Sequence, residues 1–110
     1  MINIIENKKI KLSETEYQIY SNQLKIEDLG IKGQEKIKKT RALVIGAGGL
    51  GCIIIMYLAI SGFGTIGLID GDRVEYSNLN RQILYDITDI KEFKVIAAKK
   101  KLMLYEQIAT

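Results

Sequence analysis

The sequence of 110 residues contains no histidine and a single cysteine, Cys52. One thiol excludes an internal disulfide and an all-cysteine metal site, and the lack of histidine removes the other side chain that most often completes such sites. We therefore expect no metal to be held by cysteine and histidine in this chain, and one free thiol suits a reducing compartment. Because Cys52 falls inside an apolar run, we expect a small buried residue there and not a reactive thiolate.

The sequence also lacks a long hydrophobic run. Its longest, "CIIIMYLAI" at 52–60, is flanked by glycines and is far shorter than the roughly 20 residues that a membrane span needs. The first dozen residues have neither the apolar region of a secretory signal nor the Arg and Ser bias of a transit peptide. We expect no membrane partner and a location in the cytoplasm, or in the stroma if the gene belongs to an organelle.

No dense tract of one charge is present either. The net charge is +3 with a pI of about 8.9, and the lysines are spread through amphipathic stretches, which argues against a nucleic-acid partner. Hydrophobic residues make up 47% and charged residues 26% of the chain. This composition is typical of one globular unit, which need not be a complete one.

Residues 1–40 are expected to form a helical segment. Ser13 and Glu16 have the spacing of a capping box, in which a hydroxyl and a carboxylate bind the free amides of a helix start, so a helix is predicted over about 14–25. Gly30 and Gly33 interrupt the pattern, and a short polar helix is predicted at about 34–40.

Residues 41–110 alternate between strands and helices. Short runs of branched residues predict buried strands at about 42–46 and 65–70. The helix predicted between them, at about 49–62, is apolar nearly all round, as expected of a helix packed between a sheet and another layer. Loops at 71–90 lead to an amphipathic helix at about 91–108, and we expect Tyr57 and Tyr105 in the core.

This order of elements predicts an α/β fold with a Rossmann-like parallel β-α-β-α unit at 41–110. A strand, helix, strand sequence implies a right-handed parallel crossover. Two parallel strands with their helices would leave sheet edges and apolar faces uncovered. We therefore expect an incomplete domain.

The glycines after the first predicted strand form a nucleotide-binding pattern. Gly46, Gly48 and Gly51 match G-x-G-x-x-G between a strand and a helix, where they allow a tight turn, close approach of a phosphate, and close packing of helix and strand. The helix N-terminus offers free N–H groups to the anion. Asp70 ends the second strand, where a carboxylate can accept hydrogen bonds from ribose hydroxyls. This pattern indicates a nucleotide but does not separate NAD from ATP.

Residues after Asp70 favour ATP. A hydride-transferring enzyme has no general need for Asn78, Arg81 and Lys94 there, because its chemistry takes place on the nicotinamide ring. Attack on the α-phosphate of ATP does need cations and amide donors, because charge builds up on the phosphate and leaves with pyrophosphate.

Three stretches, "GAGGLG", "GLIDGDRVEYSNLNRQIL" and "KVIAAKKKL", resemble the adenylation domain of the MoeB/ThiF/HesA family, which is related to ubiquitin-activating enzymes. The resemblance covers about residues 19–105. It implies ATP- and Mg²⁺-dependent adenylation of the C-terminal glycine of a ubiquitin-like sulfur-carrier protein, in molybdopterin or thiamine biosynthesis, by a homodimer in its full-length form.

The resemblance also implies a role for individual residues. Gly48 and Gly49 would lie against the phosphates, Asp70 would hold the ribose, and Arg81 and Lys94 would be the catalytic cations. Asp72 would assist the nucleotide or the metal, although turn formation explains it equally well. The full set of expected ATP-binding residues is Gly46, Gly48, Gly49, Gly51, Asp70, Asp72, Ser77, Asn78, Arg81 and Lys94.

Two departures from the family set limits on this expectation. Ile19 and Asn22 stand at the two arginine positions of the family's R-Y-S-R-Q motif, whose second arginine acts in the partner's active site. The family's magnesium-binding aspartate, zinc-binding Cys-x-x-Cys pairs and carrier groove would lie beyond Thr110. We therefore expect a truncated or partial form that does not adenylate a carrier alone. The alternatives are an NAD-binding oxidoreductase fragment and a non-catalytic remnant used for dimerisation or binding.

Overall fold

The computed structural model describes residues 2–6 and 11–109, with side-chain positions for 11–104. The expected side-chain position of Tyr105 lies outside that range. The strands are β1 (Ile2–Glu6), β2 (Arg41–Ile45) and β3 (Thr65–Ile69), the α-helices are α1 (Glu14–Ile19), α2 (Ser21–Leu24), α3 (Gly30–Lys39), α4 (Gly49–Ser61) and α5 (Lys94–Ala109), and two short 3-10 helices are η1 (Tyr76–Asn78) and η2 (Ile87–Asp89).

The three strands form one sheet in the order β1-β3-β2. β2 pairs with β3 in parallel, with Arg41 opposite Thr65 and Ile45 opposite Ile69. Because α4 connects these two strands, the predicted parallel β-α-β unit is confirmed.

The start of the expected helical segment needs a correction, because residues 2–6 form a strand. β1 runs antiparallel to β3, with Ile2 opposite Ile69 and Glu6 opposite Thr65. Its hydrogen bonds come from the edge of β3, about sixty residues away in the chain, and strand formation depends strongly on such non-local pairing. β1 thereby covers one of the two sheet edges that the β-α-β unit leaves open.

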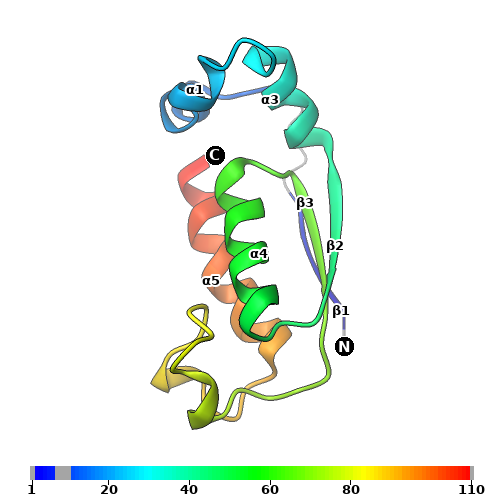
Figure 1. Ribbon diagram of the computed structural model, residues 1–110, viewed down its shortest axis with the longest axis vertical. Helices are drawn as coiled ribbons and strands as arrows, with labels where there is room; N and C mark the ends of the chain where they lie inside the picture. The colour runs from blue at the N-terminus through cyan, green and yellow to red at the C-terminus, as the bar shows by residue number, and fades with distance from the viewer. Residues whose placement is uncertain (1, 7–10, 110) are drawn as a thin grey trace.

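α4 and α5 lie on one face of the sheet (Figure 1). The buried cluster between them and the sheet consists of Ala47, Cys52, Ile55, Leu68, Val74, Leu84, Tyr85, Val95, Ala97, Ala98 and Leu102. On the opposite face, Leu43 and Ile45 of β2 are 59% and 77% exposed.

This arrangement corrects the expectation for α4. Its fully buried residues are Cys52 and Ile55, whereas Leu50 and Tyr57 are 79% and 66% exposed. The prediction that Tyr57 belongs to the core is wrong for the same reason: the described residues cover α4 only on the side that faces the sheet and α5.

The capping box at the start of α1 is confirmed, but the helix that follows is shorter than predicted. The Ser13 hydroxyl accepts from the Glu16 amide at 3.1 Å, and the Glu16 carboxylate accepts from the Ser13 amide at 3.0 Å. The chain then bends at Tyr20, with φ −95° and ψ 14°, which separates α1 from α2. Gly30 and Gly33 do not interrupt a helix; they lie within α3, where a Cβ on Gly33 would meet the Leu29 side chain at 2.7 Å.

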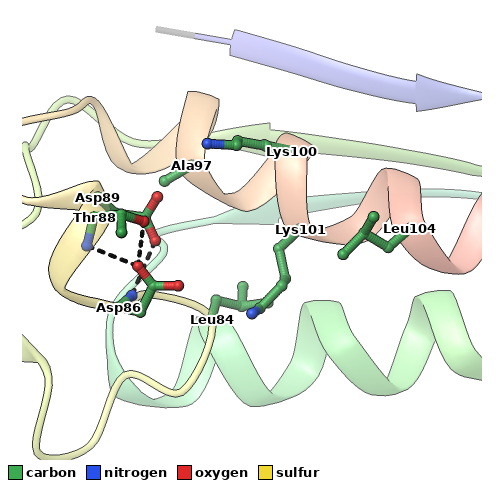
Figure 2. Close-up of a pocket in the computed structure, with 8 residues that line it drawn as sticks. All are labelled: Leu84, Asp86, Thr88, Asp89, Ala97, Lys100, Lys101 and Leu104. Carbon is green, nitrogen blue, oxygen red and sulfur yellow. Dashed lines mark hydrogen bonds between the residues drawn. The ribbon is translucent and has the colours of Figure 1, made fainter.

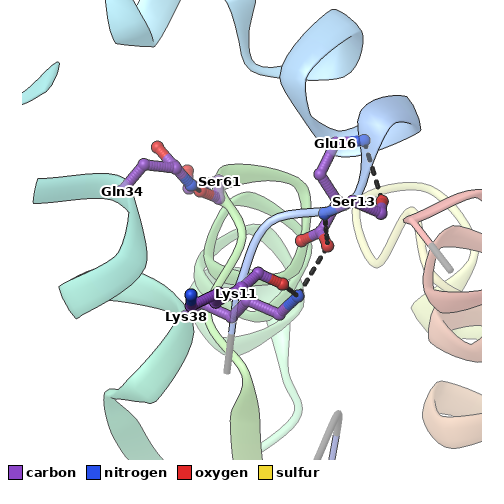
Figure 3. Close-up of polar contacts among 6 residues, drawn as sticks. All are labelled: Lys11, Ser13, Glu16, Gln34, Lys38 and Ser61. Carbon is purple, nitrogen blue, oxygen red and sulfur yellow. Dashed lines mark hydrogen bonds and ion pairs between the residues drawn. The ribbon is translucent and has the colours of Figure 1, made fainter. Parts of the chain in front are cut away.

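The helices α1 to α3 are attached to the C-terminal end of α4. The Gln34 amide donates to the Ser61 carbonyl at 2.8 Å, and Gln23 donates to the same carbonyl at 3.2 Å. A buried ion pair of 2.6 Å joins Glu16 to Lys38, whose ammonium also donates to the Lys11 carbonyl at 2.7 Å (Figure 3). These bonds leave the N-terminal end of α4 free for the segment that follows β3.

That segment, residues 70–93, crosses the other end of the molecule as loops and the two 3-10 helices (Figure 1). Arg73 and Phe93 form an isolated antiparallel bridge, and Lys91 has a φ of 70°. Residues 91–93 therefore belong to this bridge and not to the predicted helix, which begins only at Lys94. Within the described part of the chain, no helix has both the length and the apolarity that crossing a bilayer requires.

Candidate functional site

The glycine turn, residues 46–51, connects the end of β2 to the start of α4. Gly46 has a φ of +98°, a left-handed conformation that side chains other than glycine rarely adopt, and its amide donates to the Ile69 carbonyl at 2.8 Å. Gly48 is the N-cap of α4, and its carbonyl accepts from the Cys52 amide at 2.9 Å. The turn therefore has the strand-to-helix position that the motif predicts.

The glycines of this turn serve two different purposes. A Cβ on Gly51 would lie 1.9 Å from the Gly46 carbonyl oxygen, so the chain itself requires glycine there. By contrast, a Cβ on Gly48 would be 4.0 Å from the Gln82 amide nitrogen, and one on Gly49 would be 3.9 Å from Cδ of Arg81. A Cβ would fit at both positions in ordinary van der Waals contact, so the fold itself does not require glycine there. Without a Cβ, the backbone at these positions is accessible to close approach by a ligand.

Ala47, at the centre of the turn, is held from both sides. Its amide donates to Asp70 at 2.8 Å, and its carbonyl accepts from the Tyr85 hydroxyl at 2.9 Å and from the Cys52 thiol at 3.3 Å. The second oxygen of Asp70 accepts from the Asp72 amide at 2.7 Å. Asp70 therefore fixes the glycine turn as well as the bend that follows β3.

The side chains of Cys52 and Tyr85 remain protonated near neutral pH. Burial raises the pKa of Cys52, although hydrogen bonds with Tyr85 and Leu84 and the charge of Lys94 act in the opposite direction. Burial also raises the pKa of Tyr85, and the neighbouring Cys52 raises it further. The prediction that Cys52 is buried is confirmed, and Tyr85 is a supporting residue that the motif did not indicate.

Two of the expected cations differ sharply in exposure. Arg81 is exposed, lies over Gly49, and donates to the Ser77 carbonyl and to Asn80, each at 3.0 Å. Lys94 is 6% exposed, and its ammonium has no hydrogen bond or ion pair with the residues that the structure describes. Among the described residues, the fully buried atom without a partner is Gln82 Oε1 and not the Lys94 ammonium, so the Lys94 side chain keeps access to the cavity that it lines.

Lys94 lines a cavity of about 210 Å³ together with Asp72, Arg73, Glu75 and Asn78. The Lys94 amide donates to the Asp72 carbonyl at 2.9 Å, which ties the start of α5 to the bend after Asp70. Asn78 is nearly buried, and its side-chain oxygen Oδ1 accepts from the Glu75 backbone amide at 2.9 Å. The side-chain NH₂ group is then the part of Asn78 that can donate to a ligand.

Expected site residues thus fall into two adjoining groups. Arg81 lies with Gly48 and Gly49, whereas Asp72, Asn78 and Lys94 share the cavity, and Asp70 connects the two groups through Ala47 and Asp72. Ser77 is exposed, and its carbonyl positions Arg81. Arg73 is engaged elsewhere, because its guanidinium stacks on Phe93 at 3.8 Å and donates to the Lys91 carbonyl.

A second cavity, of about 190 Å³, lies between η2 and α5 (Figure 2). Its carboxylates already cap η2: Asp86 accepts from the amide and hydroxyl of Thr88, and Asp89 accepts from the Asp86 amide at 2.9 Å. The hydrogen bonds from Thr88 lower the pKa of Asp86. We assign no ligand to this cavity.

No three acidic, cysteine or histidine side chains come together in a possible metal site among the residues that the structure describes. Asp72 and Glu75 are exposed at the cavity that contains Lys94, but two carboxylates beside two cations do not make a cage for Mg²⁺.

Comparisons with known proteins agree with this geometry. Residues 20–107 match the ThiF family. The adenylyltransferase and sulfurtransferase uba4 of Aspergillus clavatus is 51% identical over 87 residues, which are 79% of this chain and 18% of that protein. Among solved structures, PaaA is 34% identical with a TM-score of 0.81, over 94% of this chain and 37% of PaaA. Escherichia coli MccB, crystallised with ATP, is 34% identical with a TM-score of 0.63, over 67% and 22% of the two chains.

This chain therefore spans less than a quarter of the curated relative that it resembles, yet the match covers both the glycine turn and the segment from Asp70 to Lys94. The fold, the glycine turn and the sequence comparison lead to the same assignment, and the chain belongs to the ThiF family.

Proposed function

We propose that the chain provides the ATP-binding part of an enzyme that adenylates the C-terminal glycine of a ubiquitin-like sulfur-carrier protein, in molybdopterin or thiamine biosynthesis. The observation that carries this proposal is the position of Arg81 over a glycine turn in which no backbone atom lies near the Cβ positions of Gly48 and Gly49, with Lys94 in a cavity that Asp72 and Asn78 also line. The named activity of uba4 and the ATP in the MccB crystals support it.

The glycine turn suits the phosphates of a nucleotide. Free N–H groups at the start of α4 point toward the turn, and the helix dipole favours an anion there. With no Cβ at Gly48 and Gly49, a phosphate can approach the backbone closely. The bonds on Ala47 hold this backbone in place before a ligand arrives.

Arg81 and Lys94 suit the charge that develops during adenylation. The Arg81 guanidinium can swing from its two weakly held partners to a phosphate and bind it with two N–H groups. The Lys94 ammonium forms no ion pair with the described residues, although Asp72 and Glu75 line the same cavity, and a phosphate bound there would pair with it. Cations held in place in this way act most strongly when pyrophosphate leaves.

The remaining residues orient the nucleotide. Asp70 accepts from two backbone amides at the end of β3, the position at which a carboxylate of this motif accepts from a ribose hydroxyl. The NH₂ group of Asn78 and the hydroxyl of Ser77 are neutral donors on the segment that follows β3. Magnesium would accompany ATP, and the described residues offer no cage for it on their own.

A homodimer of the longer form would bring one further residue to the site. Asn22 is exposed on α2, next to Gln23, which is bonded to the C-terminal end of α4. The glycine turn is at the other end of this 13-residue helix, about 20 Å away. Asn22 therefore cannot reach the glycine turn of its own chain, which supports a role in a partner's site; it would donate a hydrogen bond where family members supply a charge.

Nucleotide binding by the chain tests this proposal. Isothermal titration of the wild type should show binding of ATP, at least tenfold weaker binding of NADH, and weaker ATP binding in Gly48→Val, whose side chain would occupy the phosphate position. Preference for NADH would support the oxidoreductase alternative. Binding of neither nucleotide would support the non-catalytic alternative.

A further inference from the structure

Gln82 occupies a position beside the glycine turn that none of the expected site residues explains. It follows Arg81 directly, and its backbone is fixed on both sides: its amide donates to the Asn78 carbonyl at 2.8 Å, and its carbonyl accepts from the Tyr85 amide at 3.1 Å. The residue is 3% exposed. Its side chain therefore has a defined place in the fold and is not a solvated surface amide.

The carboxamide oxygen of this side chain has no structural partner. The buried oxygen Oε1 accepts no hydrogen bond among the described residues, whereas Nε2 is not one of the fully buried unpaired atoms. Buried polar groups in proteins are almost always paired, and leaving one unpaired is unfavourable. An apolar side chain of similar length would fill the same space without an unpaired acceptor, so packing does not account for a glutamine here.

The amide is directed at the turn. Nε2 lies 4.0 Å from the position that a Cβ of Gly48 would occupy, which is within van der Waals range. Arg81 lies in the same way over Gly49, with its Cδ at 3.9 Å. Two consecutive residues thus place a cation and a neutral donor over two consecutive glycines.

We propose that Gln82 is a further phosphate-binding residue of this site, whose Nε2 donates a hydrogen bond to the phosphate oxygen lying on Gly48. The inference rests on the proposed function, because it takes the ligand of the glycine turn to be a nucleotide. Phosphate oxygens only accept hydrogen bonds, so ligand binding also selects the orientation in which the NH₂ end of the carboxamide faces the turn. The uncharged amide adds direction to a site whose charge comes from Arg81 and Lys94.

Two substitutions separate a ligand contact from a packing role. Gln82→Met keeps the length of the side chain and removes both polar atoms, so the melting temperature should stay the same or rise while ATP binding weakens about tenfold or more. Gln82→Glu keeps the shape and replaces the donor with a negative charge, so ATP binding should be weaker still at pH 8 and should recover as the pH falls and the carboxyl is protonated. Gln18→Met, on the exposed surface of α1, controls for the exchange of glutamine for methionine.

The measurements are isothermal titration with ATP between pH 5.5 and 8 and thermal unfolding of each variant. ATP binding by both Gln82 variants at the wild-type affinity, with Gly48→Val still impaired, would overturn the role of Gln82 and leave the proposed function standing. A loss of stability in Gln82→Met without a change in affinity would also overturn it, because it would identify a packing residue. No ATP binding by the wild type would refute the proposed function and this inference with it.

Discussion

Gly51→Ala and Gly48→Ala form a matched pair that tests the two purposes of the glycine turn. The Cβ added at Gly51 would lie 1.9 Å from the Gly46 carbonyl oxygen, about 1.4 Å short of the roughly 3.3 Å at which carbon and oxygen come into contact. Backbone atoms cannot rotate away as a side chain can, so α4 and the end of β2 must move apart. We expect about 3 kcal/mol of strain.

Alanine also favours the helix over glycine, by about 1 kcal/mol, which offsets part of this strain. The net loss in Gly51→Ala should be about 2 kcal/mol, or a fall of about 10 °C in melting temperature for a domain of this size. Gly48→Ala places its Cβ in ordinary van der Waals contact, with the nearest atom, Nε2 of Gln82, at 4.0 Å. Its loss of stability should stay below about 1 kcal/mol, from the weaker N-cap alone.

Circular dichroism during heating and titration with ATP distinguish the two variants. Gly51→Ala should unfold at a clearly lower temperature, whereas Gly48→Ala should remain folded and bind ATP at least tenfold more weakly, because its methyl group occupies the phosphate position. The reasoning is refuted if Gly48→Ala destabilises the chain as much as Gly51→Ala does, or if it binds ATP like the wild type.

Two other predictions concern the groups around the turn. In a longer form with the complete ThiF domain, Arg81→Ala and Lys94→Ala should slow carrier-dependent pyrophosphate exchange about a hundredfold and weaken ATP binding less. The reason is that the charge of both side chains is needed most as pyrophosphate leaves. Unchanged exchange would make both residues ordinary surface cations. Folding raises the pKa values of Cys52 and Tyr85 and so favours their neutral forms. The contribution of these two groups to the free energy of unfolding should therefore be constant below about pH 8. It should fall as the pH rises above the pKa values that the two side chains have in the unfolded chain, near 9 and 10. Chemical denaturation between pH 7 and 11 measures this loss, and a stability that rises over this range would contradict the direction of both shifts.

Local signals in the sequence predicted the centre of the molecule well. The strand before Gly46 and the helix after Gly48 depend on short-range chemistry. A run of branched apolar residues forms the strand, Gly46 adopts the positive φ of the turn, and the helix starts at a glycine N-cap without a side-chain hydrogen bond. The capping box of Ser13 and Glu16 is equally local and is confirmed. The roles of Arg81 and Lys94 remain predictions, although the structure places Arg81 over Gly49 as the motif implies.

The features that the sequence did not indicate depend on contacts between distant segments. β1 becomes a strand only because β3 offers it an edge. The exposure of Tyr57 depends on what lies beyond α4, and an apolar helix looks the same in sequence whether one side or all sides are covered. Tyr85 and Gln82 gain their importance from Ala47 and Gly48, more than thirty residues earlier in the chain.

The hydrogen bonds on Ala47 have a consequence for the thermodynamics of binding. Asp70, Cys52 and Tyr85 come from three different parts of the chain, and together they join the phosphate-binding backbone to the core. Folding has therefore already ordered this backbone, so a nucleotide gives up little of its binding free energy to loop ordering. The same connection works in reverse: a ligand that binds only the folded turn would stabilise the whole core, by about 2.7 kcal/mol at a concentration one hundred times its Kd.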